Sequence, residues 1–186
     1  MILLLQQKDE AAFKELVMLY QHRVYHTVLG LLQNAADAED TAQEVFIQVY
    51  KWVGQFRRDA SLSTWIYRIA VTKALDFLRS KKTKTRFGFI TAVFGNDNTP
   101  VYDPPNFDHP GVALDKKEDA ALLFGLIKKL PLAQQAAFIL NKLENLSYQE
   151  IAAVLNTSPA AVDSLLQRAK QNLKKVAAAL GNNNPP

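Results

Sequence analysis

Apolar residues recur every three or four positions along three stretches of the N-terminal half, a spacing that predicts amphipathic helices. The first stretch covers residues 9–33, the second covers 35–56, and the third begins at Ser61 or Ser63. Side chains of Asn or Ser at these starts are suited to cap a helix. Because no stretch shows the strict alternation of a half-buried strand, we expect an all-α fold.

The helical pattern breaks between about 83 and 117, where glycine and proline gather with Asn and Asp between them. We interpret this stretch as a flexible linker with no fixed secondary structure. Helices then resume, and Pro131 is suited to the first turn of one of them. The sequence therefore predicts two small helical domains, with these boundaries: 1–82 for the first domain, 83–117 for the linker, 118–181 for the second domain and 182–186 for a disordered tail.

The stretch from 146 to 175 predicts a helix-turn-helix. Ser147 and Glu150 form an S-x-x-E capping box that opens a short helix. Asn156 follows that helix and tolerates the left-handed conformation that ends it. Ser158 then caps a longer amphipathic helix. A short helix, a tight turn and a longer amphipathic helix together place a recognition helix in a DNA major groove.

Composition narrows the class of protein. The chain has no cysteine, which excludes disulfides and thiolate metal sites and is compatible with a reducing cytosol. The apolar run at residues 2–5 is too short for a signal peptide or a membrane span. We therefore expect a soluble, cytoplasmic protein.

The net charge of +4 is unevenly distributed. Acidic residues gather between 37 and 44, and basic residues gather between 68 and 86 and again on the last predicted helix. Most charge runs are simply solvated helix faces. Because the second basic group falls on the helix-turn-helix, we favour two phosphate-facing surfaces and one surface for a basic partner.

Signals for catalysis and metal binding are weak. His22 and His26 share a helix face, a geometry that could chelate a divalent metal, but no HExxH or ExxH motif accompanies them. The sequence has no Gly-rich phosphate loop, and its serines mostly lie at helix caps. We expect a protein that is not an enzyme and has no cofactor, metal site or small-molecule substrate.

An ordered set of motifs carries a family resemblance. DAEDTAQEVF (37–46) is followed by STWIYRIAVTKALDFLR (63–79), a broken linker and the C-terminal helix-turn-helix. This order resembles a bacterial RNA polymerase sigma factor of the extracytoplasmic-function (ECF) class, which has only sigma regions two and four. The resemblance covers roughly three quarters of the chain. It implies a factor that directs core RNA polymerase to promoters by recognising their −35 and −10 elements.

The resemblance also implies protein partners. The acidic second helix would contact the clamp helices of the largest polymerase subunit through Asp40, Gln43 and Glu44, of which Asp40 and Glu44 share a face. The C-terminal domain would bind the flap of the second-largest subunit. An anti-sigma factor, often membrane-anchored, would clamp the two domains.

The third helix and the loop before it resemble the element that opens the −10 region. Opening requires cations to hold a displaced strand, aromatic rings to stack on unpaired bases and a pocket for a flipped base. Trp65 also lies on the apolar stripe, where a core role competes with stacking. Thr72 stands where the family often has Asn, which leaves the base preference open. The implied −10 residues are Phe56, Arg57, Arg58, Ser61, Trp65, Tyr67, Arg68, Thr72, Lys73 and Arg79.

The helix-turn-helix resembles the part of region four that reads duplex DNA at the −35 element. Many family members read V-K-S-R-L where this chain reads V-D-S-L-L at 162–166, so two bases are lost and an acid is gained. We therefore expect weak −35 binding. The implied −35 residues are Ser147, Ser158, Ala160, Ala161, Asp163, Ser164, Gln167, Arg168 and Lys170.

Two other classes of protein stay open on the residues alone. One is a dimeric helix-turn-helix repressor that acts without polymerase; the other is a helical interaction module with a degenerate helix-turn-helix. A repressor would bind duplex DNA by itself, whereas a sigma factor needs core polymerase.

Overall fold

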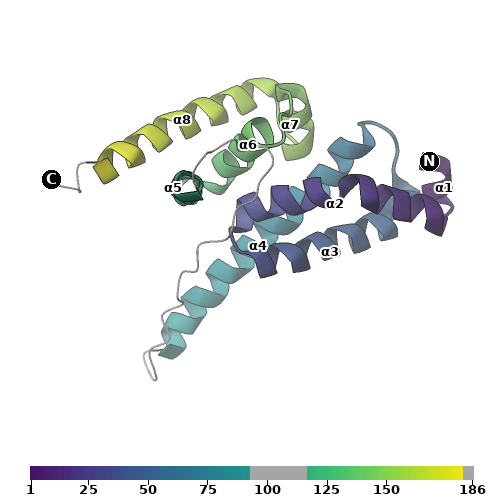
Figure 1. Ribbon diagram of the computed structural model, residues 1–186, viewed down its shortest axis with the longest axis horizontal. Coiled ribbons are helices and arrows are strands. Elements are labelled where there is room, and N and C mark those ends of the chain that lie inside the picture. Colours follow the sequence, from purple (N-terminus) through teal and green to yellow (C-terminus); the bar gives the residue numbers. More distant parts are fainter. Residues whose placement is uncertain (93–116, 182–186) are drawn as a thin grey trace.

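The computed structural model describes residues 1–92 and 117–181, and the elements in these ranges are helical (Figure 1). The predicted all-α fold is confirmed for this part of the chain. The N-terminal block consists of α1 (Ile2–Gln6), α2 (Glu10–Leu32), α3 (Ala35–Trp52), the 3₁₀ turn η1 (Val53–Gln55) and α4 (Leu62–Ala92). The C-terminal block consists of α5 (Lys117–Ile127), α6 (Leu132–Lys142), α7 (Tyr148–Leu155) and α8 (Pro159–Gly181).

Side-chain caps define where the helices of the N-terminal block begin. Asp9 accepts a hydrogen bond from the Ala12 amide at the start of α2, at 2.8 Å. Asn34 does the same for α3, as its position in the sequence predicts. At the start of α4 the Ser61 hydroxyl accepts from the Thr64 amide at 3.1 Å. Each cap satisfies a backbone donor that the first helical turn leaves without a partner.

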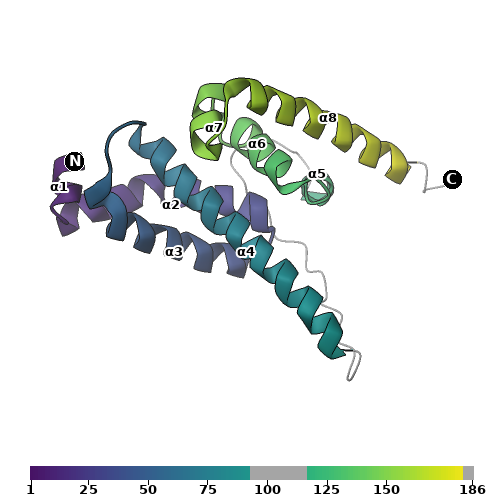
Figure 2. The same ribbon diagram turned by 180° about the vertical axis from the view of Figure 1, so that it is seen from behind.

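The core of the N-terminal block lies where α2, α3 and α4 pack against one another (Figure 2). Leu16 and Val28 of α2, Val45 of α3 and Ile66 of α4 are at most 1% exposed. These residues lie on the apolar stripes that the sequence predicts. Burial of such side chains contributes about 1.5–3 kcal/mol each relative to exposure and holds the three helices together.

The helices differ from the sequence prediction in two places. A short helix, α1, precedes the first predicted one and buries Leu5. The predicted linker begins too early, because α4 continues to Ala92 and does not end near 82. Gly88 is the one glycine between residues 83 and 92, and a single glycine costs a helix only about 1 kcal/mol. The remaining predicted linker and the predicted tail lie outside the described residues.

The two blocks are packed together and share one apolar core. Ile139 of α6 lies over Gly30 of α2, where an added Cβ would come within 3.3 Å of the isoleucine. The Gln33 amide nitrogen donates to the Phe124 carbonyl at 2.8 Å across the same interface. Helices α4 and α7 also contact each other. The separate domains expected from the sequence therefore meet over an extensive interface.

In the described part of the chain, no helix combines the length and apolarity that crossing a membrane requires.

Candidate nucleic-acid and partner interfaces

The acidic face of α3 lies on the surface of the N-terminal block. Asp40, Gln43 and Glu44 are exposed, while Val45 and Val49 turn the opposite side of the helix into the core. The structure thus brings the three predicted polymerase-facing residues together on one accessible surface. Glu44 also forms an ion pair with a neighbouring helix, which reduces the net charge that this surface presents.

Two ion pairs connect α3 with α4. The Lys73 ammonium lies 3.0 Å from the Glu44 carboxylate, and the Lys81 ammonium lies 2.9 Å from Asp37. In each pair one side chain is exposed and the other is half-buried, so each contributes at most about 1 kcal/mol to stability. Lys73, a predicted DNA contact, is therefore held beside a predicted polymerase contact.

The loop between η1 and α4 carries the exposed arginines of the predicted −10 element. Arg57, Arg58 and Ser61 are exposed. Arg58 has a left-handed backbone conformation with φ 63°, which is costly for a residue with a Cβ. A cavity of about 280 Å³ lies beside this loop and is also lined by Trp65, Arg68 and Ala153 of the C-terminal block. The loop presents cations next to an aromatic ring.

The predicted stacking aromatics are mostly covered in this arrangement. Phe56 is 6% exposed and Tyr67 is 3% exposed. Trp65 is half-buried and packs on Phe56, with ring centroids 5.2 Å apart. Of the three rings, only Trp65 is partly accessible here. Stacking of a base on Tyr67 requires that the C-terminal block move away.

Glu144 of the C-terminal block covers Tyr67. The Tyr67 hydroxyl donates to a Glu144 carboxylate oxygen at 2.7 Å. Burial, followed by the negative charge of Glu144, raises the pKa of the Tyr67 hydroxyl. Burial raises the pKa of the Glu144 carboxyl above its ordinary value, although hydrogen bonds from Tyr67 and Thr27 and the nearby Arg23 oppose this effect. The contact therefore joins two titratable groups that are both removed from water.

Arg68 is the second predicted −10 residue that the C-terminal block engages. Its guanidinium donates to the Ala153 carbonyl of α7, with its Nε at 3.0 Å. The side chain is exposed, so it lies at the rim of the interface. Two other predicted −10 residues form ion pairs within the N-terminal block: Lys73 with Glu44 at 3.0 Å and Arg79 with Asp76 at 2.8 Å.

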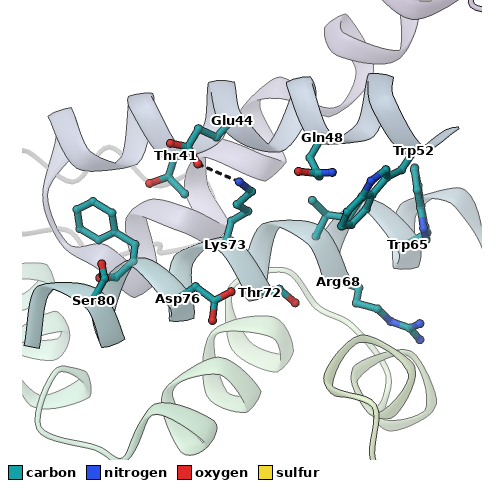
Figure 3. Close-up of a pocket in the computed structure, with 12 residues that line it drawn as sticks. Thr41, Glu44, Gln48, Trp52, Trp65, Arg68, Thr72, Lys73, Asp76 and Ser80 are labelled. Atoms are coloured by element: carbon teal, nitrogen blue, oxygen red, sulfur yellow. Dashed lines mark hydrogen bonds and ion pairs between the residues drawn. The ribbon is translucent and has the colours of Figure 1, made fainter. Parts of the chain in front are cut away.

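A groove of about 660 Å³ runs between α3 and α4 (Figure 3). Its lining includes the predicted DNA contacts Trp65, Thr72 and Lys73, and also Gln48 and Trp52. Trp52 is 49% exposed and was not among the residues predicted from the sequence. No signal for this exposure was present in the sequence, because Trp52 lies three residues after Val49 and seven after Val45, on the same side of the helix as the apolar stripe. We call this cleft the α3–α4 groove.

The predicted helix-turn-helix is confirmed in α7 and α8. Ser147 and Glu150 form the reciprocal capping box, and Asn156 ends α7 in the left-handed conformation with φ 52°. The hydrogen bond to Ser147 lowers the pKa of Glu150, as expected for a carboxylate held by hydrogen-bond donors. The Ser158 hydroxyl accepts from the Ala161 amide at 3.2 Å and caps α8.

The first turns of α8 present a mostly polar surface to solvent. Val162, Leu166 and Ala169 are buried beneath it. Asp163 is half-buried and accepts a hydrogen bond from the Gln167 amide at 2.8 Å. Ala161 is also half-buried; the exposed predicted −35 residues are Ser147, Ser158, Ala160, Ser164, Gln167, Arg168 and Lys170.

The histidine pair of α2 lies beside the acidic face of α3, because His22 and Gln43 line the same groove. His22 lines a groove of about 470 Å³ between α2 and α3, together with Tyr25 and Glu39. Burial, and secondarily the proximity of His22, lowers the pKa of His26. Within residues 1–92 and 117–181, no three side chains of His, Cys, Asp or Glu come together as a metal site would require.

Comparison with known protein families divides the chain into the same two blocks. Residues 16–84 match Sigma-70 region 2, and residues 121–173 match Sigma-70, region 4. The first match covers α3 and most of α4, and the second covers the helix-turn-helix.

Curated proteins show similarity along most of the chain. The RNA polymerase sigma-H factor of Pseudomonas aeruginosa is 31% identical over 175 residues, which cover 94% of this chain and 91% of that protein. The ECF RNA polymerase sigma-E factor of Escherichia coli is 31% identical over 166 residues, which cover 89% and 86% respectively.

Solved structures share the fold at lower sequence identity. CnrH, solved in complex with the cytosolic domain of CnrY, has a TM-score of 0.69 at 19% identity and covers 96% of this chain and 95% of its own. The sigma factor RpoE of Bartonella quintana, solved in complex with the anti-sigma factor NepR, has a TM-score of 0.67 at 17% identity. That match covers 90% of this chain and 97% of RpoE.

Proposed function

This chain belongs to the sigma-70 family and is an ECF sigma factor that directs RNA polymerase to promoters; from this we propose how its two blocks divide that function. The observation that supports this proposal is the combination of an exposed acidic helix face, an arginine loop and a helix-turn-helix in one chain. The first domain extends from α1 to the end of α4, and the second from α5 to α8. The protein works in the cytoplasm, where polymerase and promoter DNA are found.

The exposed face of α3 binds the clamp helices of the largest polymerase subunit. Asp40, Gln43 and Glu44 supply acidic and polar groups that suit a basic partner surface. Glu44 gives up or shares its ion pair with Lys73 when the partner binds. The C-terminal block binds the flap of the second-largest subunit.

Promoter DNA is read by both blocks. The N-terminal turns of α8 enter the −35 major groove, where Arg168 and Lys170 suit phosphates. The arginine loop and the start of α4 hold the melted −10 strand. Tyr67 and Arg68 can bind the −10 element only when the blocks separate. In the docked arrangement these side chains form hydrogen bonds with Glu144 and with the Ala153 carbonyl.

An anti-sigma factor regulates the protein. Support comes from RpoE, which has the same fold and was solved with its anti-sigma factor. Such a partner would act by holding the two blocks away from polymerase and DNA. Membrane anchoring of that partner remains a prediction from the family resemblance.

The first experiment is capture of purified bacterial core RNA polymerase by this protein, followed by run-off transcription on a genomic fragment library. Binding together with new start sites is the expected result and would also supply the promoter consensus. Tight binding to duplex DNA without polymerase binding would instead identify an independent repressor and refute the proposal.

Charge reversal tests the polymerase-facing surface. Glu44→Lys and Asp40→Lys should each lower the affinity for core polymerase, because both place a cation on a surface that suits a basic partner. Glu15→Lys is the matched control, since Glu15 is an exposed acid on α2 outside this surface. Equal affinities for all three variants would remove α3 from the interface.

A further inference from the structure

We propose that Gln167 of α8 contacts an adenine of the −35 element and that Asp163 is the positioning residue that orients Gln167. The assignment rests on the proposed function, in which the N-terminal turns of α8 enter the −35 major groove. To that function it adds the base that one side chain selects. It also gives Asp163, an acid on a DNA-facing helix, a role that a basic residue at this position could not fill.

The exposed face of α8 begins with short side chains and carries long ones about two turns later. Ala160 and Ser164 are exposed, and the Ser164 hydroxyl donates to the Ala160 carbonyl at 3.1 Å. Gln167 and Arg168 are the first long side chains of α8 that are exposed. The helix lies on the side of the C-terminal block that faces away from α2 and α3 (Figure 1). Short side chains allow a helix to approach DNA closely, so the long amide beyond them can reach a base edge in the major groove.

Asp163 determines which end of the Gln167 amide faces it. The two residues are four apart on α8, a spacing that places them on one face of the helix. The Gln167 Nε2 donates to the Asp163 Oδ2 at 2.8 Å. An ionised carboxylate can only accept hydrogen bonds, so the amide must present its nitrogen, and not its oxygen, to Asp163.

Half-burial of Asp163 limits the movement of this pair. Val162 and Leu166, which flank the pair along the chain, are at most 1% exposed and hold this part of α8 against the block. The Gln167 oxygen makes no hydrogen bond to another described residue. One N–H hydrogen and the oxygen of the amide therefore remain available to a base.

These two remaining groups match adenine and not guanine. The major-groove edge of adenine has an acceptor at N7 and a donor at its N6 amino group, which pair with one amide N–H and one amide oxygen. Guanine has two acceptors, N7 and O6, at the same edge. Only one of them could be satisfied, because the second N–H hydrogen of Gln167 is bound by Asp163. The negative charge of Asp163 beside the amide further disfavours an edge that carries only acceptors.

Selection from a duplex DNA library tests the base preference. The library is a promoter fragment recovered in the run-off experiment, with its −35 element randomised, and the holoenzyme selects from it. Sequencing of the bound DNA gives the preference at each position. The wild-type holoenzyme should prefer adenine over guanine by about 5-fold to 150-fold at one position, the discrimination of one bidentate contact. Gln167→Ala should remove the preference at that position alone.

Variants of Asp163 test its positioning role. Asp163→Ala releases the second N–H hydrogen of Gln167 and should lower the adenine-over-guanine preference by about 5-fold at the same position. Asp163→Asn should retain most of the preference, because its side-chain oxygen can still accept from Gln167. Gln171→Ala is the matched control, since Gln171 is an exposed amide four residues farther along α8. It should leave the preference unchanged.

Three results would overturn the proposal. The first is a base preference that Gln167→Ala does not alter. The second is an equal loss of affinity for all sequences in Asp163→Ala, which would limit the pair to stabilising the helix. The third is a preference for guanine at the position that depends on Gln167. If the proposed function itself failed, the wild-type chain would neither bind core polymerase nor start transcription, and the assignment of Gln167 would fall with it.

Discussion

Replacement of Tyr67 with Phe removes one hydrogen bond between the two blocks and leaves the packing of the ring unchanged. The hydroxyl donates to the Glu144 carboxylate at 2.7 Å, and the residue is 3% exposed. A hydrogen bond to a charged acceptor contributes about 1.5–3 kcal/mol. Tyr67→Phe should therefore lower the free energy of unfolding by about 1.5–3 kcal/mol at neutral pH.

This penalty should depend on pH, because burial raises the pKa of Glu144 in the docked structure. A raised pKa means that docking favours the protonated carboxyl. Its stabilising contribution is full below the ordinary value of 4.5 and is lost as the pH rises through the raised value. Once Glu144 is protonated, the hydrogen bond joins neutral groups and contributes about 0.5–1.5 kcal/mol. The Tyr67→Phe penalty should thus shrink as the solution is acidified.

Urea unfolding followed by circular dichroism at several pH values measures this effect. Glu144→Gln should remove the pH dependence, and the double variant completes a cycle that isolates the Tyr67–Glu144 coupling. Tyr50→Phe is the matched control, since the Tyr50 ring is half-buried against Phe13 but its hydroxyl has no hydrogen-bond partner among the described residues. If Tyr67→Phe costs no more than the control at any pH, the two blocks are not docked through this contact in solution.

Three further changes test the helix-turn-helix. Ser147→Ala should lower the free energy of unfolding by about 0.5–2 kcal/mol, because the Ser147 hydroxyl accepts from the Glu150 amide and donates to the Glu150 carboxylate. Urea unfolding measures this change, and a value near zero would contradict the cap. Asn156→Ala should cost roughly 1–2 kcal/mol in the same assay, since φ 52° places its backbone in the left-handed region. Asp163→Lys should raise affinity for −35 duplex DNA in the holoenzyme and steepen the salt dependence by about 0.9 in log–log slope. An unchanged slope would place residue 163 away from the phosphates.

Local chemistry along the chain determined the helices and the helix-turn-helix. The capping box at Ser147, the left-handed Asn156 and the cap at Asn34 each act within a few residues of themselves. The positions at which these helices begin and end therefore do not depend on distant parts of the fold. The motif order was also sufficient to identify the sigma factor family, which the comparisons confirm.

The errors in the sequence prediction arose where local signals were weak. The end of α4 was placed near 82 because glycine and proline gather after that point, yet the stretch TKTRFGFITA (83–92) contains one glycine and no proline and is helical until Ala92. Helix α1 was missed because five residues are too few to show a period. In both cases the residues can adopt the helical conformation, although no strong local signal in the sequence predicts that they do.

Tertiary structure alone decided which of the predicted surface residues are accessible. Tyr67 is covered by Glu144, 77 positions away, and the Gln33 amide nitrogen donates to the carbonyl of Phe124, 91 positions away. Periodicity describes which side of a helix is apolar, but it contains no information on which distant segment will cover that side. The same limit applies to Trp52, which has the helical spacing of the apolar stripe with Val45 and Val49 but is 49% exposed. Only the packing of α3 beside α4 turned that exposed ring into the wall of a groove.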